Sequence, residues 1–419
     1  MTPRVAAIIL AGGQGTRLHP LTINHAKPAV LYGGKYRLID IPISNAVNSN
    51  FSDIFVIVQY LGNELEHYIS EAYRFDSFRP GSINVLSPQE NAKGEKEWFH
   101  GTADAVRKNL PELLKTPAEY YLILSGDQLY NINFQSMLQF AQEQDADLTI
   151  ASLPVRKKEA LRMGIIEAQS NGHVTAFVEK PKNLEVLHPF TLPKTSYQQW
   201  NRPYPLESTY LGSMGIYIFK REALISLLKE DLRDDFGYHL IDTAVQKGKT
   251  YTHVYHGYWE DIGTVASYYE ANLMLTEGAG GLITTDQNNP IYSKSFHLPG
   301  PKVCCTKINQ SIVCEGCTIE ASEISHSIIG VRSRIQQGTV IRDSVIMGNH
   351  TFAEEDSGYG IGANCIIEKA IIDENVRIGN NVKLTNTQKL DRYDGDGIYI
   401  RDGIVIVTHG TTLPDHFSL

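Results

Sequence analysis

The sequence predicts an α/β domain followed by a parallel β-helix. The chain has 419 residues, which is more than one ordinary core holds and indicates at least two domains. From residue 5 to about 275, short β-like runs alternate with helical patterns, which is typical of an α/β domain with a largely parallel sheet. Further on, Ile and Val recur every five or six residues, which is typical of a β-helix. We therefore place the domains at 1–277 and 302–419, with a turn-rich linker at 278–301.

The elements of the first domain follow from apolar periodicity and capping residues. Thr102 and Asn133 are the expected amino-terminal caps of two of the helices. The turn Ser170-Asn-Gly-His joins two short β runs as a hairpin. The predicted strands are Val5–Leu10, Ile54–Tyr60, Tyr121–Leu124 and Leu148–Leu153, the hairpin runs are Gly164–Glu167 and Val174–Val178, and the helices are Leu61–Tyr73, Thr102–Leu114 and Phe134–Glu143.

The repeat of the second domain is neither helical nor a plain strand alternation. A few irregular strands would not keep such a spacing, and the glycines fall where coils turn corners. The period does not determine the handedness of the coil. The recurring positions are Ile319, Ile324, Ile329, Ile335, Ile341, Ile346, Ile361, Ile367, Ile372, Ile378 and Leu384, interrupted by a predicted loop at 349–360.

Composition excludes several classes of function. The net charge is -9 and the basic residues are scattered, which argues against nucleic acid or an anionic membrane as a partner. No apolar stretch approaches the roughly 18 residues of a membrane span. The apolar run after Arg4 is shorter than the core of a signal peptide, so we expect a cytoplasmic protein.

The cysteines leave a zinc site open as an alternative. Cys304, Cys305, Cys314 and Cys317 crowd together, and two pairs could ligate zinc. Adjacent cysteines form a poor half-site, however, and small buried residues are expected in a β-helix without any metal. Their odd total of five argues against a disulfide scaffold.

A glycine-rich turn follows the first strand. It is not a Walker A loop, because no Gly-Lys-Ser/Thr follows, and the third glycine of a dinucleotide fingerprint would fall at Leu18. The backbone N–H groups of Gly12, Gly13 and Gly15 could still bind an anion, with Arg17 as a planar cation suited to polyphosphate. Lys27 adds a second cation nearby. A turn without any ligand is the alternative.

Carboxylates are the second group of candidate functional residues. Asp127 follows an apolar strand, at the edge where open α/β sheets bind ligands. Glu260 and Asp261 precede a turn that opens another helix. Two carboxylates facing a polyphosphate are what Mg²⁺-assisted phosphoryl chemistry requires. A single Asp after a strand is more often a cap or turn former, so the combination carries the prediction.

Seven segments together resemble one family. In chain order they are "LAGGQGTRLHPLT", "AKPAVLYGGKYRLIDIPISN", "WFHGTADAV", "LSGDQLY", "FVEKP", "SMGIYIF" and "YWEDIGT". They are similar to the sugar-nucleotide pyrophosphorylases and, more narrowly, to the glucose-1-phosphate adenylyltransferases. The resemblance implies a GT-A-like Rossmann-type nucleotidyltransferase domain joined to a left-handed β-helix, in a homotetramer. It also implies that ATP and α-D-glucose 1-phosphate react with Mg²⁺ to give ADP-glucose and pyrophosphate, for glycogen or starch.

The resemblance assigns roles to residues that match the family's motifs. It implies Arg17, Lys27, Asp127 and Asp261 as catalytic residues, the two aspartates being the Mg²⁺ ligands. The implied nucleotide-binding residues are Gly12, Gly13, Gly15, Thr16, Gln89 and Gly101, and the implied sugar-phosphate-binding residues are Phe99, Gly164, Glu179, Lys180 and Ser213. The chain departs from the family at Glu90, where relatives have a second Gln, and at Phe99, which is Tyr in enteric relatives.

An anionic metabolite effector is also implied by the resemblance. Lys35, Arg37, Lys383 and Arg401 match activator-region positions, although Arg401 stands for a Lys. His25 replaces an Arg, and Glu66 and Glu71 stand where plant relatives have Arg. These sign reversals favour weaker anion binding, and ordinary surface charges with weak regulation are the alternative.

Three other functions remain open. Glu90 and His100 are compatible with a UTP-using nucleotidyltransferase of the same fold. A regulatory non-catalytic subunit is expected to lose Arg17, Lys27 or Asp127, all of which are present. An acyltransferase acting through the β-helix would need a catalytic histidine on a coil, for which His326 and His350 are available.

Overall fold

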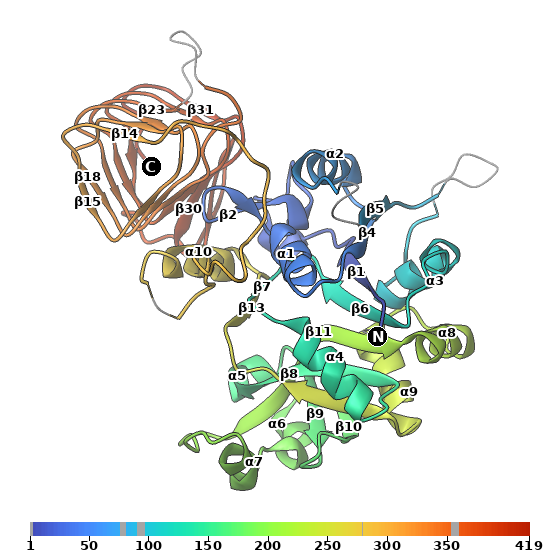
Figure 1. Cartoon of the computed structure of the whole chain (residues 1–419). Coiled ribbons are helices and arrows are strands. Elements are labelled where there is room, and N and C mark those ends of the chain that lie inside the picture. The colour runs from blue at the N-terminus through green and yellow to red at the C-terminus, as the bar shows by residue number, and fades with distance from the viewer. Residues whose placement is uncertain (1–2, 76–80, 90–96, 279, 353–359) are drawn as a thin grey trace.

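The computed structural model describes residues 3–75, 81–89, 97–278, 280–352 and 360–419 (Figure 1). A mixed α/β domain is followed by a coil of short strands that lies beside it. The first domain contains the strands β1 (Val5–Ala11), β4 (Asp53–Val58), β5 (Ser82–Leu86), β6 (Tyr120–Ser125), β8 (Leu148–Arg156), β9 (Gly164–Ala168), β10 (Val174–Glu179), β11 (Thr209–Lys220) and β12 (Thr250–Val254), and the short ribbons β2 (Leu31–Tyr32) with β3 (Tyr36–Arg37) and β7 (Gln128–Tyr130) with β13 (Trp259–Asp261).

Helices cover both faces of the central sheet because its strands are apolar on both faces. Along β1, Ala6 and Ile8 enter one core, whereas Ala7 and Ile9 enter the other. The helices are α1 (Asp40–Asn48), α2 (Gly62–Ala72), α3 (Thr102–Leu113), α4 (Phe134–Glu143), α5 (Lys157–Ala160), α6 (Leu184–Leu187), α7 (Lys194–Gln199), α8 (Arg221–Glu230), α9 (Ile241–Gln246) and α10 (Val265–Met274), with short helical turns at Thr16–Leu18, Lys27–Ala29, His188–Phe190 and Phe236–Leu240.

The predicted strands and helices are present, but the sheet is mixed rather than largely parallel. Its path is β10-β9-β11-β6-β1-β4-β5, with β8 pairing β11 and β12. β1 is parallel to β4 and β6, whereas the long strand β11 is antiparallel to β6, β8 and β9. The predicted hairpin forms β9 and β10. Local periodicity identifies strands, but the direction of β11 in the sheet depends on how the strands pack together in the tertiary structure.

One of the two predicted helix caps is correct. Asn133 accepts a hydrogen bond from the backbone N–H of Gln135 (2.9 Å). Thr102 does not cap α3, because the helix begins one residue earlier with Gly101 as its cap residue. The Thr102 hydroxyl instead donates to Asp235 (3.0 Å) and accepts from the N–H of Phe236 (3.0 Å). The hydroxyl that the local sequence predicted as a helix cap is therefore hydrogen-bonded to a loop that is distant in the sequence.

The second domain winds short strands into a coil of three sheets, seen end-on at the upper left of Figure 1. Successive turns pair in parallel, and one sheet ends in antiparallel strands. Each predicted Ile position lies inside the coil above its equivalent in the next turn, as in Ile319↔Ile335↔Ile361↔Ile378. The strands are β14 (Lys302–Val303), β15 (Lys307–Asn309), β16 (Ile312–Val313), β17 (Thr318–Ile319), β18 (Glu323–Ser325), β19 (Ile328–Ile329), β20 (Arg334–Ile335), β21 (Val340–Arg342), β22 (Val345–Ile346), β23 (Gly360–Ile361), β24 (Ile366–Glu368), β25 (Ala370–Ile372), β26 (Arg377–Ile378), β27 (Lys383–Leu384), β28 (Arg392–Asp394), β29 (Ile398–Arg401), β30 (Ile404–Val407) and β31 (Thr412–Leu413). Much of the predicted loop at 349–360 lies outside the described residues.

A shared apolar core joins the two domains. It combines Leu18 and Leu38 of the first domain and Tyr268 of α10 with Ile328 and Ile406 of the β-helix. Because these side chains are fully buried, separating the domains would expose a large apolar surface. The relative placement of the domains is therefore part of the folded state.

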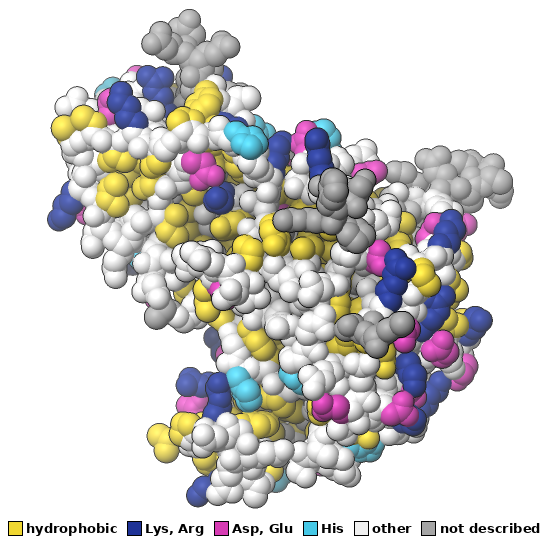
Figure 2. All heavy atoms as spheres, in the orientation of Figure 1, with side chains coloured by type: hydrophobic (Ala, Val, Ile, Leu, Met, Phe, Trp, Pro, Cys, Tyr) yellow, Lys and Arg dark blue, Asp and Glu magenta, His cyan; other side chains and the backbone are white. Residues whose placement is uncertain are grey.

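Charges of both signs are interspersed over the face shown in Figure 2. No helix in the described part of the chain is long and apolar enough to span a membrane.

Asp40 of α1 should make the stability of the fold depend on pH. It is fully buried and accepts hydrogen bonds from the hydroxyls of Tyr68 (2.7 Å) and Tyr73 (2.6 Å). Burial nevertheless raises its pKa to about 6, from 3.8 in an unfolded chain. Between these values the folded state keeps a proton that the unfolded state releases, so raising the pH lowers the free energy of unfolding, by about 3 kcal/mol at most.

The measurement is urea unfolding of the wild type and Asp40→Asn at pH values across that window. The variant cannot titrate here, so the stability of the wild type relative to it should fall as the pH rises from about 4 to about 6. A difference that stays constant would mean that folding does not shift the pKa of Asp40, and one that grows with pH would mean that folding lowers it.

Candidate active site

The glycine-rich turn leaves β1 at the centre of the sheet. Gly15 adopts φ 64°, and a Cβ there would lie 2.9 Å from Thr22 Cγ2 and 3.0 Å from Lys27 Cβ. The Thr22 hydroxyl donates to the Gly15 carbonyl (3.0 Å). A Cβ on Gly13, by contrast, would meet nothing within 4 Å. Gly15 is thus required by the turn and its packing, whereas Gly13 leaves room for a ligand to approach the backbone.

Tertiary pairing brings the two aspartates together. Asp127 follows β6, and the next residues form β7, which pairs with β13 so that Asp261 lies opposite Gln128. The N–H of Ile262 donates to the Asp127 carbonyl (3.2 Å), which holds the two segments in register. Burial, and then the charge of Asp127, raise the pKa of Asp261 above its usual value. The two carboxylates therefore lie close enough to repel each other.

Cations oppose this repulsion. The buried Lys27 ammonium donates to Asp127 Oδ2 at 2.5 Å, and the Ser125 hydroxyl donates to Asp127 Oδ1. The positive charges of Lys27 and of the exposed Arg17 oppose the rise in the pKa of Asp261 without cancelling it. The carboxylates of Asp127 and Asp261 come from two segments, and the cations offset their mutual repulsion only in part. Such a pair fits Mg²⁺, which binds through one or two carboxylates and retains waters.

The opposite half of the site is built from the hairpin and β11. Gly164 of β9 pairs with Glu179 of β10, and a Cβ on Gly164 would lie 2.6 Å from the Glu179 carboxylate. Lys180 has a left-handed backbone (φ 44°), and its ammonium lies 3.3 Å from Glu179 Oε1 and 5.1 Å from the Tyr238 ring centre. Burial raises the pKa of Glu179, and Lys180 opposes that shift. This arrangement places a half-exposed cation beside a carboxylate that can accept from hydroxyls.

A cleft of about 570 Å³ joins the two halves. Ten of the predicted residues line it: Gly12, Gly13, Phe99, Gly101, Asp127, Gly164, Glu179, Lys180, Ser213 and Asp261. Lys27 does not line the cleft but donates a hydrogen bond to Asp127, which does. Gly15, Thr16 and Arg17 are not among the lining residues. Gln89 is exposed and also outside the lining, and Glu90 lies outside the described residues.

The structure adds residues that sequence reasoning missed. Gln59, just after β4, holds the Phe99 backbone, because its side-chain oxygen accepts from the Phe99 N–H (2.9 Å) and its side-chain nitrogen donates to the Phe99 carbonyl (3.3 Å). Gln128 joins the β7–β13 ribbon to β11 through the Met214 carbonyl (2.9 Å). Both residues line the cleft, and the rule that ligands bind beyond the carboxyl ends of parallel strands could have indicated Gln59. Gly101 has a packing role, because a Cβ there would lie 2.4 Å from the Asp234 carbonyl oxygen.

Comparison with known proteins agrees with this geometry. Residues 6–278 match the nucleotidyl transferase family. The chain belongs to the nucleotidyl transferase family. Residues 297–417 match the GLGC left-handed parallel beta-helix domain, which gives the handedness that the repeat period left open. The two domains together form the architecture characteristic of glucose-1-phosphate adenylyltransferase. The chain is accordingly a nucleotidyltransferase of the GlgC type, a class that acts on nucleotides and sugar phosphates.

In this nucleotidyltransferase the four activator candidates are not brought into one cluster by the described contacts. Lys35 lies 3.3 Å from Glu315 Oε1 across the domain interface, and Arg37 lies 2.8 Å from Glu64 Oε1. Arg401 pairs with Asp394 (2.5 Å) within the β28–β29 hairpin, whereas Lys383 is exposed on β27. Glu71, one of the sign reversals, pairs with Lys294 (2.5 Å).

The contacts of the β-helix residues do not favour the remaining alternatives. His326 lies 2.7 Å from Asp343, and His350 lies 2.5 Å from Glu374. The cysteines are split between an exposed adjacent pair (Sγ–Sγ 3.4 Å) and buried thiols that contact backbone carbonyls. Among the described residues, the group that could hold a metal contains no cysteine.

Proposed function

We propose that this nucleotidyltransferase transfers the adenylyl group of ATP to α-D-glucose 1-phosphate and releases pyrophosphate, making ADP-glucose for glycogen or starch. The observation that carries the proposal is the position of the Asp127–Asp261 pair between two different half-sites. The open glycine turn lies on one side, and Glu179, Lys180 and Ser213 lie on the other. Such an arrangement suits two anionic substrates that meet at a shared cation.

In this proposal each half-site positions one substrate. Backbone N–H groups of Gly12 and Gly13 bind the triphosphate, and Arg17 approaches its outer phosphates. Lys180 binds the sugar phosphate, and Glu179 accepts from a sugar hydroxyl. Asp127 and Asp261 would hold Mg²⁺, which supplies charge neutralisation at the phosphate oxygens.

The chemistry needs no covalent intermediate and no general base. The phosphate oxygen of glucose 1-phosphate is already anionic at neutral pH and attacks the α-phosphorus. A new P–O bond forms there as the bond to the β-phosphate oxygen breaks, and pyrophosphate leaves with the electron pair. Lys27, held 2.5 Å from Asp127, and Arg17 offset the charge that develops on these oxygens.

The test is pyrophosphate release from glucose 1-phosphate with each of the four nucleoside triphosphates and Mg²⁺. We expect release with ATP to exceed that with UTP, CTP and GTP. Release with UTP but not ATP would assign the chain to a uridylyltransferase of the same fold. No release with any of the four would favour a non-catalytic subunit.

A further inference from the structure

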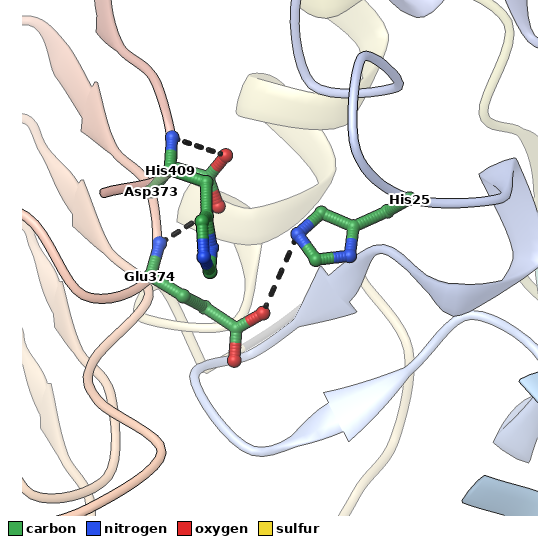
Figure 3. A group of neighbouring side chains, drawn as sticks. All are labelled: His25, Asp373, Glu374 and His409. Carbon is green, nitrogen blue, oxygen red and sulfur yellow. Dashed lines mark hydrogen bonds and ion pairs between the residues drawn. The ribbon is translucent and has the colours of Figure 1, made fainter. Parts of the chain in front are cut away.

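Four metal-ligating side chains meet where the β-helix packs against the first domain (Figure 3). They are His25, which lies between the glycine turn and Lys27, and Asp373, Glu374 and His409 of the β-helix. Their ligand atoms all lie within 4.8 Å of one another. His25, Asp373 and Glu374 are each more than nine-tenths buried.

The coil itself brings the three β-helix residues together. β25 and β30 are parallel neighbours in register, with Ile372 beside Val407. The residues that follow these two strands therefore occupy adjacent corners. Asp373 links the two corners, because its two carboxylate oxygens accept hydrogen bonds from the N–H groups of Glu374 (2.7 Å) and His409 (3.1 Å). This half of the cluster is thus rigidly placed by backbone pairing.

His25 presents an unpartnered ring nitrogen to the cluster. Its Nδ1 lies 3.1 Å from both carboxylate oxygens of Glu64, so the N–H belongs on Nδ1. The other nitrogen, Nε2, is buried without a hydrogen-bond partner and faces Glu374 Oε2 at 3.8 Å, as the dashed line in Figure 3 marks. Histidine ligands of metals commonly donate their second N–H to a carboxylate in this way. His409 Nδ1 is likewise buried without a partner.

The surrounding charges favour a cation. Glu64 is paired with Arg37 (2.8 Å), and one oxygen of Glu374 is held by His350 (2.5 Å). Glu374 Oε2, which faces His25 Nε2 at 3.8 Å, has no hydrogen bond of its own among the described residues. Buried carboxylates are costly unless they are paired or coordinate a metal.

We propose that His25, Asp373, Glu374 and His409 form a binding site for a divalent transition-metal ion of the zinc class, separate from the catalytic cleft. Two imidazoles and two carboxylates suit zinc and its first-row neighbours, whereas Mg²⁺ prefers oxygen alone. Ligand atoms around a tetrahedral zinc are about 3.4 Å apart, so binding requires the cluster to contract by about an ångström. Because its ligands come from both domains, the ion clamps the β-helix to the loop that carries Lys27.

The experiment measures metal binding rather than catalysis. The full chain carries Cys304→Ser and Cys305→Ser, because these exposed thiols could bind zinc by themselves. After chelator treatment, equilibrium dialysis with Zn²⁺ at mildly alkaline pH, with excess Mg²⁺ to occupy the proposed Asp127–Asp261 site, should give one zinc ion per chain and a higher Tm. Co²⁺ in place of Zn²⁺ should give visible d–d bands without thiolate-to-metal charge transfer.

Two ligand variants and one control test the assignment. His409→Ala and Glu374→Gln should each weaken Zn²⁺ binding at least about 100-fold, since loss of even a supporting partner costs 10–100-fold. Glu374→Gln preserves shape and guards against a folding defect. His67→Ala, whose side chain is 75% exposed on α2, should bind as the parent does. Absence of stoichiometric binding, or binding that neither ligand variant weakens, would overturn the proposal.

Discussion

Asp127→Asn should lower kcat by roughly 10³-fold or more while leaving the protein folded. The substitution is isosteric, so the hydroxyl of Ser125 still finds an oxygen to which it can donate. It removes one of the two carboxylates that would hold Mg²⁺ and the anionic partner of Lys27. Both losses reduce stabilisation of charge in the transition state, and therefore turnover more than substrate binding.

The measurement is steady-state pyrophosphate release at saturating substrates, with circular dichroism and urea unfolding alongside. Asp145→Asn is the matched control. Asp145 lies on the surface between Lys220 and Lys249, and its left-handed backbone (φ 46°) suits Asn equally well. We expect this control to retain wild-type turnover. Near wild-type kcat in Asp127→Asn would contradict the proposed mechanism.

Arg17→Ala should reduce kcat by about 10²–10³-fold with little change in stability. Arg17 is exposed, so truncation leaves no buried group unpaired. It follows the glycine turn, where we propose that the triphosphate binds, and its charge acts on Asp261. The KM for glucose 1-phosphate should therefore change little, because Lys180 and Glu179 lie on the other side of the cleft.

Initial rates at varied glucose 1-phosphate and saturating ATP separate these effects. Arg156→Ala serves as the control, because its side chain is 74% exposed and its ion pair with Glu207 is loose at 3.9 Å. A loss confined to the KM for glucose 1-phosphate would place Arg17 on the sugar-phosphate side instead. An unchanged kcat would show that Arg17 is not a catalytic residue.

Sequence alone predicted several strands and helices of the first domain and the repeat of the second. The apolar runs identified β1, β4, β6 and β8, and every position of the predicted Ile repeat lies inside the coil, although the coil also buries Val407 and Leu413, which the repeat did not include. These predictions succeed because burial on a strand or coil imposes a local period. Ten of the residues that the motifs and the family resemblance selected line the cleft.

Tertiary structure decided what local patterns do not encode. The direction of β11 made the sheet mixed, and the β7–β13 ribbon placed Asp261 beside Asp127 across more than a hundred residues. The Thr102 hydroxyl donates to Asp235 instead of capping its helix, and His25 lies against residues of the β-helix. In each case the partner is distant in sequence, and its position depends on packing between elements rather than on the period of any one of them.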